Sequence, residues 1–140
     1  TANSVQNITG PLLDRIDIHI EVPAVEFKEL SSKQNGMPSS QMRKHVETAR
    51  RSQAERFVDS RINCNAQMNS RQVREFCPLD KVAENLLRDS VTEIGLSARA
   101  HDKVLRLSRT IADLDGSGPI DVMHIQEAVN YRMLDRQFWT

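Results

Sequence analysis

Two arginines stand where a rigid backbone element could direct them at a phosphate group. Arg15 lies immediately before an alternating apolar segment, and Arg99 lies two residues after Ser97, a good helix N-cap. Guanidinium stays charged at any working pH and offers a planar fork of donors that matches phosphate oxygens. A cation in the first turn of a helix opposes the helix dipole, so the position of Arg99 calls for an explanation. For Arg15 the alternative is a surface ion pair with Asp14 or Asp17. For Arg99 the alternative is a solvated side chain.

Further cations lie on and just after a helix that is predicted over residues 40–57. They are only partly offset by nearby acids, and they are Arg43, Lys44, Arg50, Arg51, Arg56 and Arg61. Such a row could track the phosphates of DNA, with Arg43, Lys44, Arg50 and Arg51 as the candidate contacts. No aromatic residue is interleaved for base stacking, so the residues alone favour the alternative of a solvated helix face.

Other chemistry finds little support in the residues. No Gly-x-x-x-x-Gly-Lys-Ser/Thr loop occurs, so the 140 residues offer no cradle for a triphosphate. The four histidines and two cysteines lack partners at metal-ligand spacing, and we predict no metal site. Residues 113–121 follow the first nine positions of an EF-hand calcium loop, but the twelfth position holds His124 instead of Glu. A helix end, a turn and an N-cap explain the same residues without an ion.

The elements that must position these side chains are predicted to be mainly helical. Residues 16–22 alternate between apolar and polar types, which predicts one β-strand with a buried face. Because a lone strand leaves backbone groups unpaired, we expect this strand to have completed a sheet outside the chain. Residues 30–39 are rich in Ser, Lys, Gln, Asn, Gly and Pro, which predicts a linker.

Helices follow with clear start and stop signals. Ser39 or Ser40 can cap the helix that runs to about Phe57, and a short helix is predicted over residues 71–76. Three longer helices then begin at good N-caps and two of them end at glycine, the caps being Asp80, Ser97 and Asp121 and the glycines Gly95 and Gly116. The short connections favour neighbouring helices packed in a small bundle.

Composition bounds the class of protein. Nineteen basic residues balance nineteen acidic ones, so no net charge draws the chain to nucleic acid or to an anionic membrane. No apolar run approaches the roughly 20 residues of a membrane span, and no signal-peptide pattern occurs. We therefore expect no membrane partner and a cytoplasmic location.

Residues 10–23 and 96–114 resemble two landmark motifs of the magnesium-chelatase-like AAA+ ATPases, and residues 39–139 resemble that family's C-terminal domain in order and spacing. The endings at residues 110–114 and 131–136 are more similar to the competence-associated ComM/YifB branch than to the chlorophyll-pathway subunit. The resemblance implies that residues 1–29 are the C-terminal remnant of an ATPase core, with a linker over 30–39 and a helical lid domain over 40–140.

The same resemblance implies a hexameric ring that uses ATP and Mg²⁺ to drive movement on DNA. Arg15 matches the arginine finger that acts in trans on the next subunit's nucleotide, and Arg99 matches the second-sensor arginine of the lid. The fragment itself is expected to bind no cofactor and to be inactive alone. Two alternatives stay open: a motor for metal insertion into a tetrapyrrole, and a non-enzymatic ion-binding or scaffold module.

Overall fold

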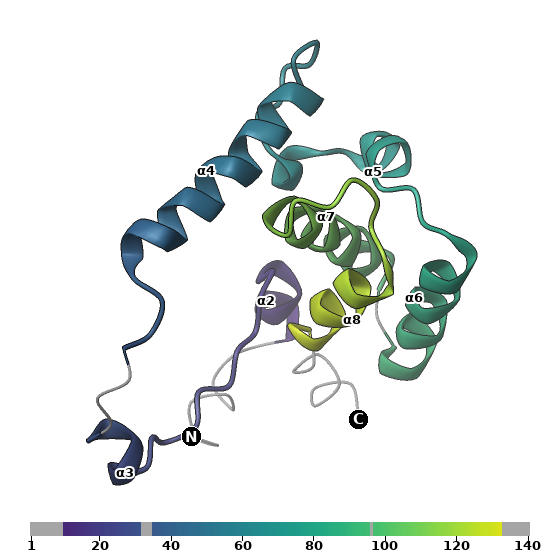
Figure 1. The fold of residues 1–140 in the computed structure, drawn as a ribbon. Helices are drawn as coiled ribbons and strands as arrows, with labels where there is room; N and C mark the ends of the chain where they lie inside the picture. Colours follow the sequence, from purple (N-terminus) through teal and green to yellow (C-terminus); the bar gives the residue numbers. More distant parts are fainter. Residues whose placement is uncertain (1–9, 32–34, 96, 133–140) are drawn as a thin grey trace.

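The computed structural model describes residues 10–31, 35–95 and 97–132, and within them the fold is helical (Figure 1). The five longer helices are α4 (Ser39–Arg56), α5 (Ser70–Phe76), α6 (Lys81–Ile94), α7 (Ala98–Leu114) and α8 (Val122–Asn130). The short ones are α2 (Gly10–Arg15), α3 (Phe27–Leu30) and the 3₁₀ turn η1 (Asn65–Gln67). Residues 133–140, the end of the predicted lid domain, lie outside the described part.

Helix α7 is the centre of the bundle. It packs against α8, α4, η1 and α5, and α6 packs on α8. Its apolar stripe includes Val104 and Ala112, which are fully buried against a core that also contains Ile125 of α8. Four elements therefore hold α7 in place, while Ala98 and Arg99 in its first turn are exposed.

Side-chain caps fix where three of the helices begin, as the sequence predicts. Asp80 accepts a hydrogen bond from the Ala83 amide, Ser97 from the Ala100 amide and Asp121 from the Met123 amide. Gly95 ends α6 in the left-handed region at φ 69°, which favours glycine. The prediction for α4 is wrong in one detail: Pro38 is the N-cap, and no side chain caps that helix.

The predicted strand over residues 16–22 does not form, since the structure has no regular strand within the described residues. Ile18 and Ile20 are 43% and 65% exposed, whereas His19, from the alternate face, is buried. A strand needs a neighbour to pair its backbone groups. Here the His19 amide donates to the Tyr131 carbonyl at 2.7 Å, a single bond to the end of α8. The one β-bridge in the described part joins Leu79 to Ile120.

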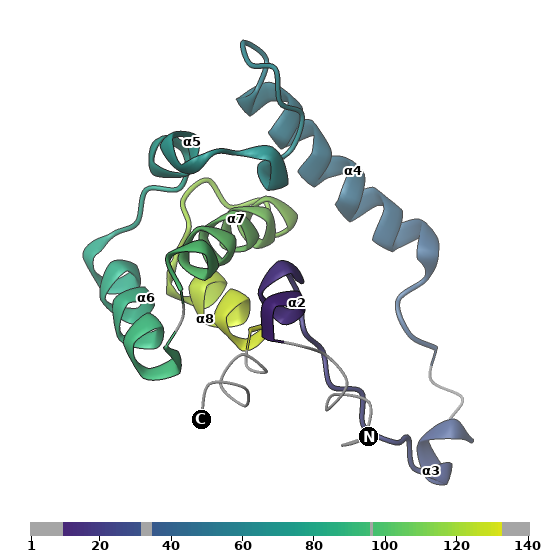
Figure 2. The ribbon, with the colours of Figure 1, turned by 180° about the vertical axis from the view of Figure 1, so that it is seen from behind.

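Helix α4 is packed on the bundle only through its C-terminal half, and its N-terminal half projects away from the other helices (Figures 1 and 2). Ala49 is buried, but Met42 and Val46, which precede it on the same apolar stripe, are each 51% exposed. The predicted helix is thus confirmed, while its stripe is covered only over the last two turns.

Candidate functional site

Arg99 lies in the exposed first turn of α7, where Ser97 fixes the start of the helix. The Ser97 hydroxyl accepts a hydrogen bond from the Ala100 amide at 3.1 Å. The side chain of Arg99 remains 65% exposed and makes one long ion pair, 3.6 Å to the Asp14 carboxylate. The guanidinium is therefore largely exposed to solvent at a capped helix end.

A cleft of about 720 Å³ opens beside Arg99, between α5 and the first half of α7. Its charged lining carries an excess of cations, namely Arg74, Arg99, Lys103 and Arg106 against the single carboxylate of Asp102. Arg74 makes no ion pair within the part of the chain that the structure describes. Lys103 is paired with Asp17 and Arg106 donates to the Met68 carbonyl, so Arg74 and Arg99 are the cations best placed to donate to an anion such as a phosphate group.

The Asp102 carboxylate offsets part of the positive charge of this cleft, and it is hydrogen-bonded by its own neighbours. Ser70 donates to it at 2.7 Å, and His101 Nδ1 lies 3.3 Å away. Desolvation acts to raise the pKa of Asp102, but the hydrogen bonds from Ser70 and His101 and the nearby Arg106 outweigh it and lower that pKa. The carboxylate therefore stays charged and bound to its own neighbours.

Arg15 ends α2, and its side chain is exposed. The two acids that could form a local ion pair with it contact α7 instead. Asp14 accepts from Ser97 Oγ at 3.4 Å and pairs with Arg99, and Asp17 pairs with Lys103 at 2.8 Å. Within the described residues the Arg15 guanidinium has no ion pair. The structure thus brings the two predicted motifs together, with α2 beside the start of α7 (Figure 2).

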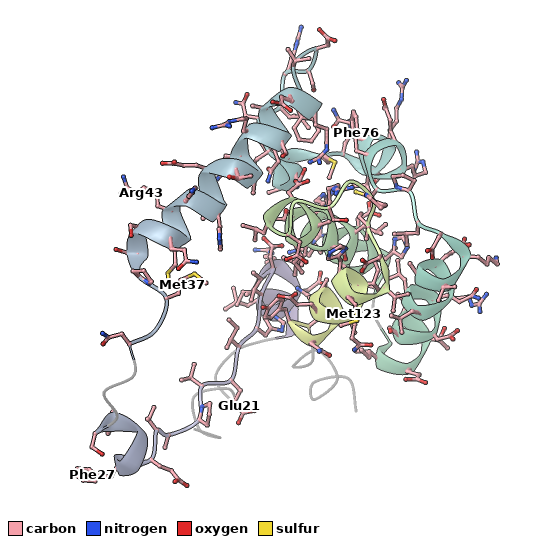
Figure 3. All side chains as sticks on the ribbon, in the orientation of Figure 1. Glu21, Phe27, Met37, Arg43, Phe76 and Met123 are labelled. Atoms are coloured by element: carbon pink, nitrogen blue, oxygen red, sulfur yellow. The ribbon has the colours of Figure 1, made fainter. Side chains whose placement is uncertain are left out.

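The candidate DNA contacts on α4 are all exposed. Arg43 lies on the half of α4 that projects from the bundle (Figure 3), and Lys44, Arg50 and Arg51 are exposed as well. Arg56 belongs to the same basic stretch of the sequence, but its side chain is mostly buried and is not part of the basic surface. It donates to both carboxylate oxygens of Asp113, at 2.8 and 2.5 Å.

A buried polar cluster around Asp113 was not predicted from the sequence. Besides Arg56, the Asp113 carboxylate accepts from the Asn65 amide at 2.9 Å and pairs with Arg109 at 3.4 Å. The Arg109–Asp113 spacing predicts a pair on the outer face of the helix, but both side chains are buried. Burial lowers the pKa of Arg109, and the Asp113 charge opposes that shift. This cluster joins α4, η1 and α7.

The loop at residues 113–121 uses its carboxylates within the protein. Asp113 lies in the buried cluster, and Asp115 and Asp121 both contact His124. The Asp121 amide donates to His124 Nδ1, so Nε2 carries the proton and donates to Asp115 at 3.0 Å. Where an EF-hand places a calcium-binding Glu, this chain has a histidine that completes a capping box.

Two further properties concern metal binding and membrane spanning. Over the described ranges, no three His, Cys, Asp or Glu side chains come together in a way that could hold a metal ion. No helix in those ranges has both the length and the apolar character that crossing a membrane requires.

Comparison with known proteins identifies the family of the chain. Residues 36–132 match the family model of the magnesium chelatase subunit ChlI C-terminal domain. Over 137 residues the chain is 36% identical to the uncharacterized protein YifB of Escherichia coli, and over 133 residues 36% identical to the competence protein ComM of Haemophilus influenzae. These alignments cover 97% and 94% of the chain but 26% and 25% of the relatives, so the chain spans about a quarter of their length. The match over most of the helical part shows that this chain belongs to the magnesium chelatase C-terminal domain family, with YifB and ComM among its relatives.

Proposed function

We propose that these residues form the nucleotide-sensing C-terminal part of a longer, cytoplasmic AAA+ ATPase that assembles as a ring, expected to be a hexamer, and uses ATP to move on or remodel DNA. The observation that carries the proposal is the exposed Arg99 guanidinium, held on a capped helix end beside a cation-lined cleft. Family membership and the similarity to a competence protein support the same class of function.

Arg99 is assigned the sensing of the terminal phosphate. ATP bound with Mg²⁺ in the ATPase core supplies the phosphoryl group that is transferred to water. Arg99, with Arg74 across the cleft, would contact that phosphate before hydrolysis and lose the contact afterwards. A ligand that binds one domain arrangement better than another shifts the population toward it. The loss of the phosphate contact would therefore change the favoured angle of the helical domain.

Arg15 is assigned a role in the active site of the neighbouring subunit. Its guanidinium is exposed and lacks an ion pair within the described residues, so its charge is available to phosphoryl oxygens. An arginine supplied in this way stabilises the charge of the transition state and is worth on the order of a thousandfold or more in rate.

The test is steady-state ATP hydrolysis by the full-length protein. Arg15→Ala should reduce turnover by about a thousandfold or more while ATP binding is retained. Arg99→Ala should also reduce turnover, because the sensing contact is lost. Arg88→Ala is the matched control: its side chain is 65% exposed, like that of Arg99, but it lies on α6 beside Asp89. Normal turnover in both Arg15→Ala and Arg99→Ala would remove the proposal.

Nucleic-acid binding is tested separately on the 140-residue chain. A variant with Arg43, Lys44, Arg50 and Arg51 changed to alanine should bind DNA more weakly at low salt. If all four contact phosphates of duplex DNA, the slope of log K against log salt should fall in magnitude by about 3.6. A variant with Lys81 and Arg88 changed to alanine is the control for loss of exposed charge.

Stimulation of the full-length ATPase separates the proposal from its nearest alternative. DNA should raise the rate of ATP hydrolysis, whereas a porphyrin with its metal ion should not. The opposite result would favour a motor that inserts metal into a tetrapyrrole. An ion-binding module is disfavoured by His124, which already contacts both Asp115 and Asp121.

A further inference from the structure

Lys103 joins the segment that carries Arg15 to the helix that carries Arg99. Its ammonium group donates to the Arg15 backbone carbonyl at 2.9 Å and to the Asp17 carboxylate at 2.8 Å. The side chain of Lys103 is only 13% exposed, in contrast to 70% for that of Asp17. A lysine this buried with two good acceptors is held in one place, unlike a typical surface lysine.

The backbone after Arg15 is bonded to the bundle at two more points. The buried Arg132 donates to the Ile16 carbonyl, and the His19 amide donates to the Tyr131 carbonyl at 2.7 Å. Tyr131 and Arg132 directly follow α8, which packs on α7. Residues 15–19 are therefore fixed to the helical domain as a unit.

Arg99 and Lys103 are four residues apart on α7 and so lie on the same face of the helix. Arg99 contacts the Asp14 carboxylate, and Lys103 donates to the Arg15 carbonyl. One face of α7 therefore contacts two consecutive residues, the second of which is Arg15 itself. The two contacts differ in length. The Asp14–Arg99 pair is 3.6 Å long and can be exchanged for a phosphate, whereas Lys103 makes two shorter contacts, at 2.9 and 2.8 Å, that do not involve Arg99.

We propose that Lys103 is a positioning residue, which makes Arg15 move with the helical domain when Arg99 senses the nucleotide. This inference rests on the proposed function, since it concerns the two arginines assigned there. A rotation of the helical domain in one subunit would displace Arg15 relative to the next subunit's nucleotide. Misplacement of a catalytic group by about 1 Å can cost on the order of 100-fold in rate, so a small rotation suffices. Lys103 would thereby couple successive sites around the ring.

The test is Lys103→Met in the full-length protein, with ATP hydrolysis measured as a function of ATP concentration. Methionine keeps the apolar stem but cannot donate to Arg15 or Asp17. Turnover should fall by about 10- to 100-fold, the Hill coefficient should fall toward one, and the affinity for a non-hydrolysed ATP analogue should stay within about twofold. Lys81→Met is the control for the loss of a lysine charge, because Lys81 is 77% exposed and within the described residues pairs with Glu84 alone.

Two more variants separate positioning from a general structural role. Lys103→Arg keeps the charge and the donors and should recover part of the cooperativity. Asp17→Asn removes the charge of a side chain that is 70% exposed, and it should lower the Hill coefficient in the same direction as Lys103→Met. In the double variant Lys103→Met with Asp17→Asn, turnover should be no lower than in Lys103→Met alone, because Lys103→Met already removes the contact on which Asp17→Asn acts.

The outcomes distinguish this inference from the proposed function. If Arg15→Ala abolishes turnover but Lys103→Met and Asp17→Asn both match Lys81→Met in rate and Hill coefficient, the positioning role is wrong and the proposed function stands. If Lys103→Met lowers nucleotide affinity and thermal stability while leaving the Hill coefficient unchanged, Lys103 is structural only. If Arg15→Ala and Arg99→Ala hydrolyse ATP normally, both proposals are overturned together.

Discussion

Changing Asp113 to asparagine should strongly destabilise the helical bundle. The Asp113 carboxylate is 1% exposed and holds two guanidinium groups, those of Arg56 and Arg109, at the junction of α4 with α7. Asparagine has almost the same shape and retains an oxygen for the Asn65 amide. The variant therefore removes the negative charge, and it also replaces one oxygen that accepts from Arg56 with an NH2 donor.

The size of the effect follows from where the two cations are left. Arg56 is 16% exposed and can recover some hydration, but Arg109 is 5% exposed and keeps only its bond to the Ser117 carbonyl at 3.1 Å. Breaking a buried pair by removing one partner costs about 3–5 kcal/mol. A small domain has a total stability of about 5–15 kcal/mol, so the variant should lose a large part of it.

Urea unfolding of the 140-residue chain, followed by far-ultraviolet circular dichroism, measures this loss. With a typical slope of about 2 kcal/mol per molar urea, the midpoint should fall by roughly 2 M. Asp89→Asn is the control, because Asp89 is 63% exposed and, in the part of the chain that the structure describes, pairs only with Arg88, at 3.3 Å. That change should cost no more than about 1 kcal/mol.

The comparison of Asp113→Asn with Asp89→Asn tests whether the buried cluster holds α4 to the bundle. If Asp113→Asn unfolds at the same urea concentration as Asp89→Asn, the buried cluster does not hold α4 to the bundle. The same result would also remove the explanation given above for why Arg56 is absent from the basic surface of α4.

Three other outcomes are expected of the same chain. Gly116→Ala, at φ 68°, should cost about 1 kcal/mol in urea unfolding, whereas Gly118→Ala should be nearly neutral because its φ is ordinary and its Cβ would meet nothing within 4 Å. Cys77 should react with iodoacetamide at pH 8 only on unfolding, as peptide mass mapping would show, since burial raises its pKa to about 11. Ser70→Ala should raise the pKa of Asp102, measured by NMR titration. Because the folded pKa of Asp102 is depressed, the Ser70→Ala variant should be less stable than the parent chain at neutral pH. The difference in stability between the two should shrink as the pH falls through that folded pKa.

The helices were predictable because their signals are local. Asp80 and Ser97 each accept from an amide three residues on, and Gly95 has the left-handed conformation that ends α6. These contacts are complete within one turn of chain, so the sequence at that point contains everything that the structure needs. The same holds for the buried stripe of α7, whose period is visible before any neighbour is known.

The strand and the fate of Arg56 were not predictable, because each depends on partners elsewhere. Alternation at residues 16–22 indicates a strand only if another strand pairs with it, and the described residues supply one amide bond to Tyr131 instead. Arg56 has the same local sequence context as its exposed basic neighbours. Its burial is decided by Asp113, 57 residues further along the chain, which no local pattern reports.

The environment of Arg15 bears on the choice between the two roles considered for it. A local ion pair would need Asp14 or Asp17, and both of these carboxylates are bound to side chains of α7. The same contacts that take the acids away also fix the backbone of Arg15, through its carbonyl and Lys103. A cation on a fixed backbone, with its nearby acids paired elsewhere, needs little backbone ordering to bind an anion and displaces no ion-pair partner among the described residues. Local sequence alone leaves the ion pair and the phosphate contact open, whereas these contacts favour the phosphate contact.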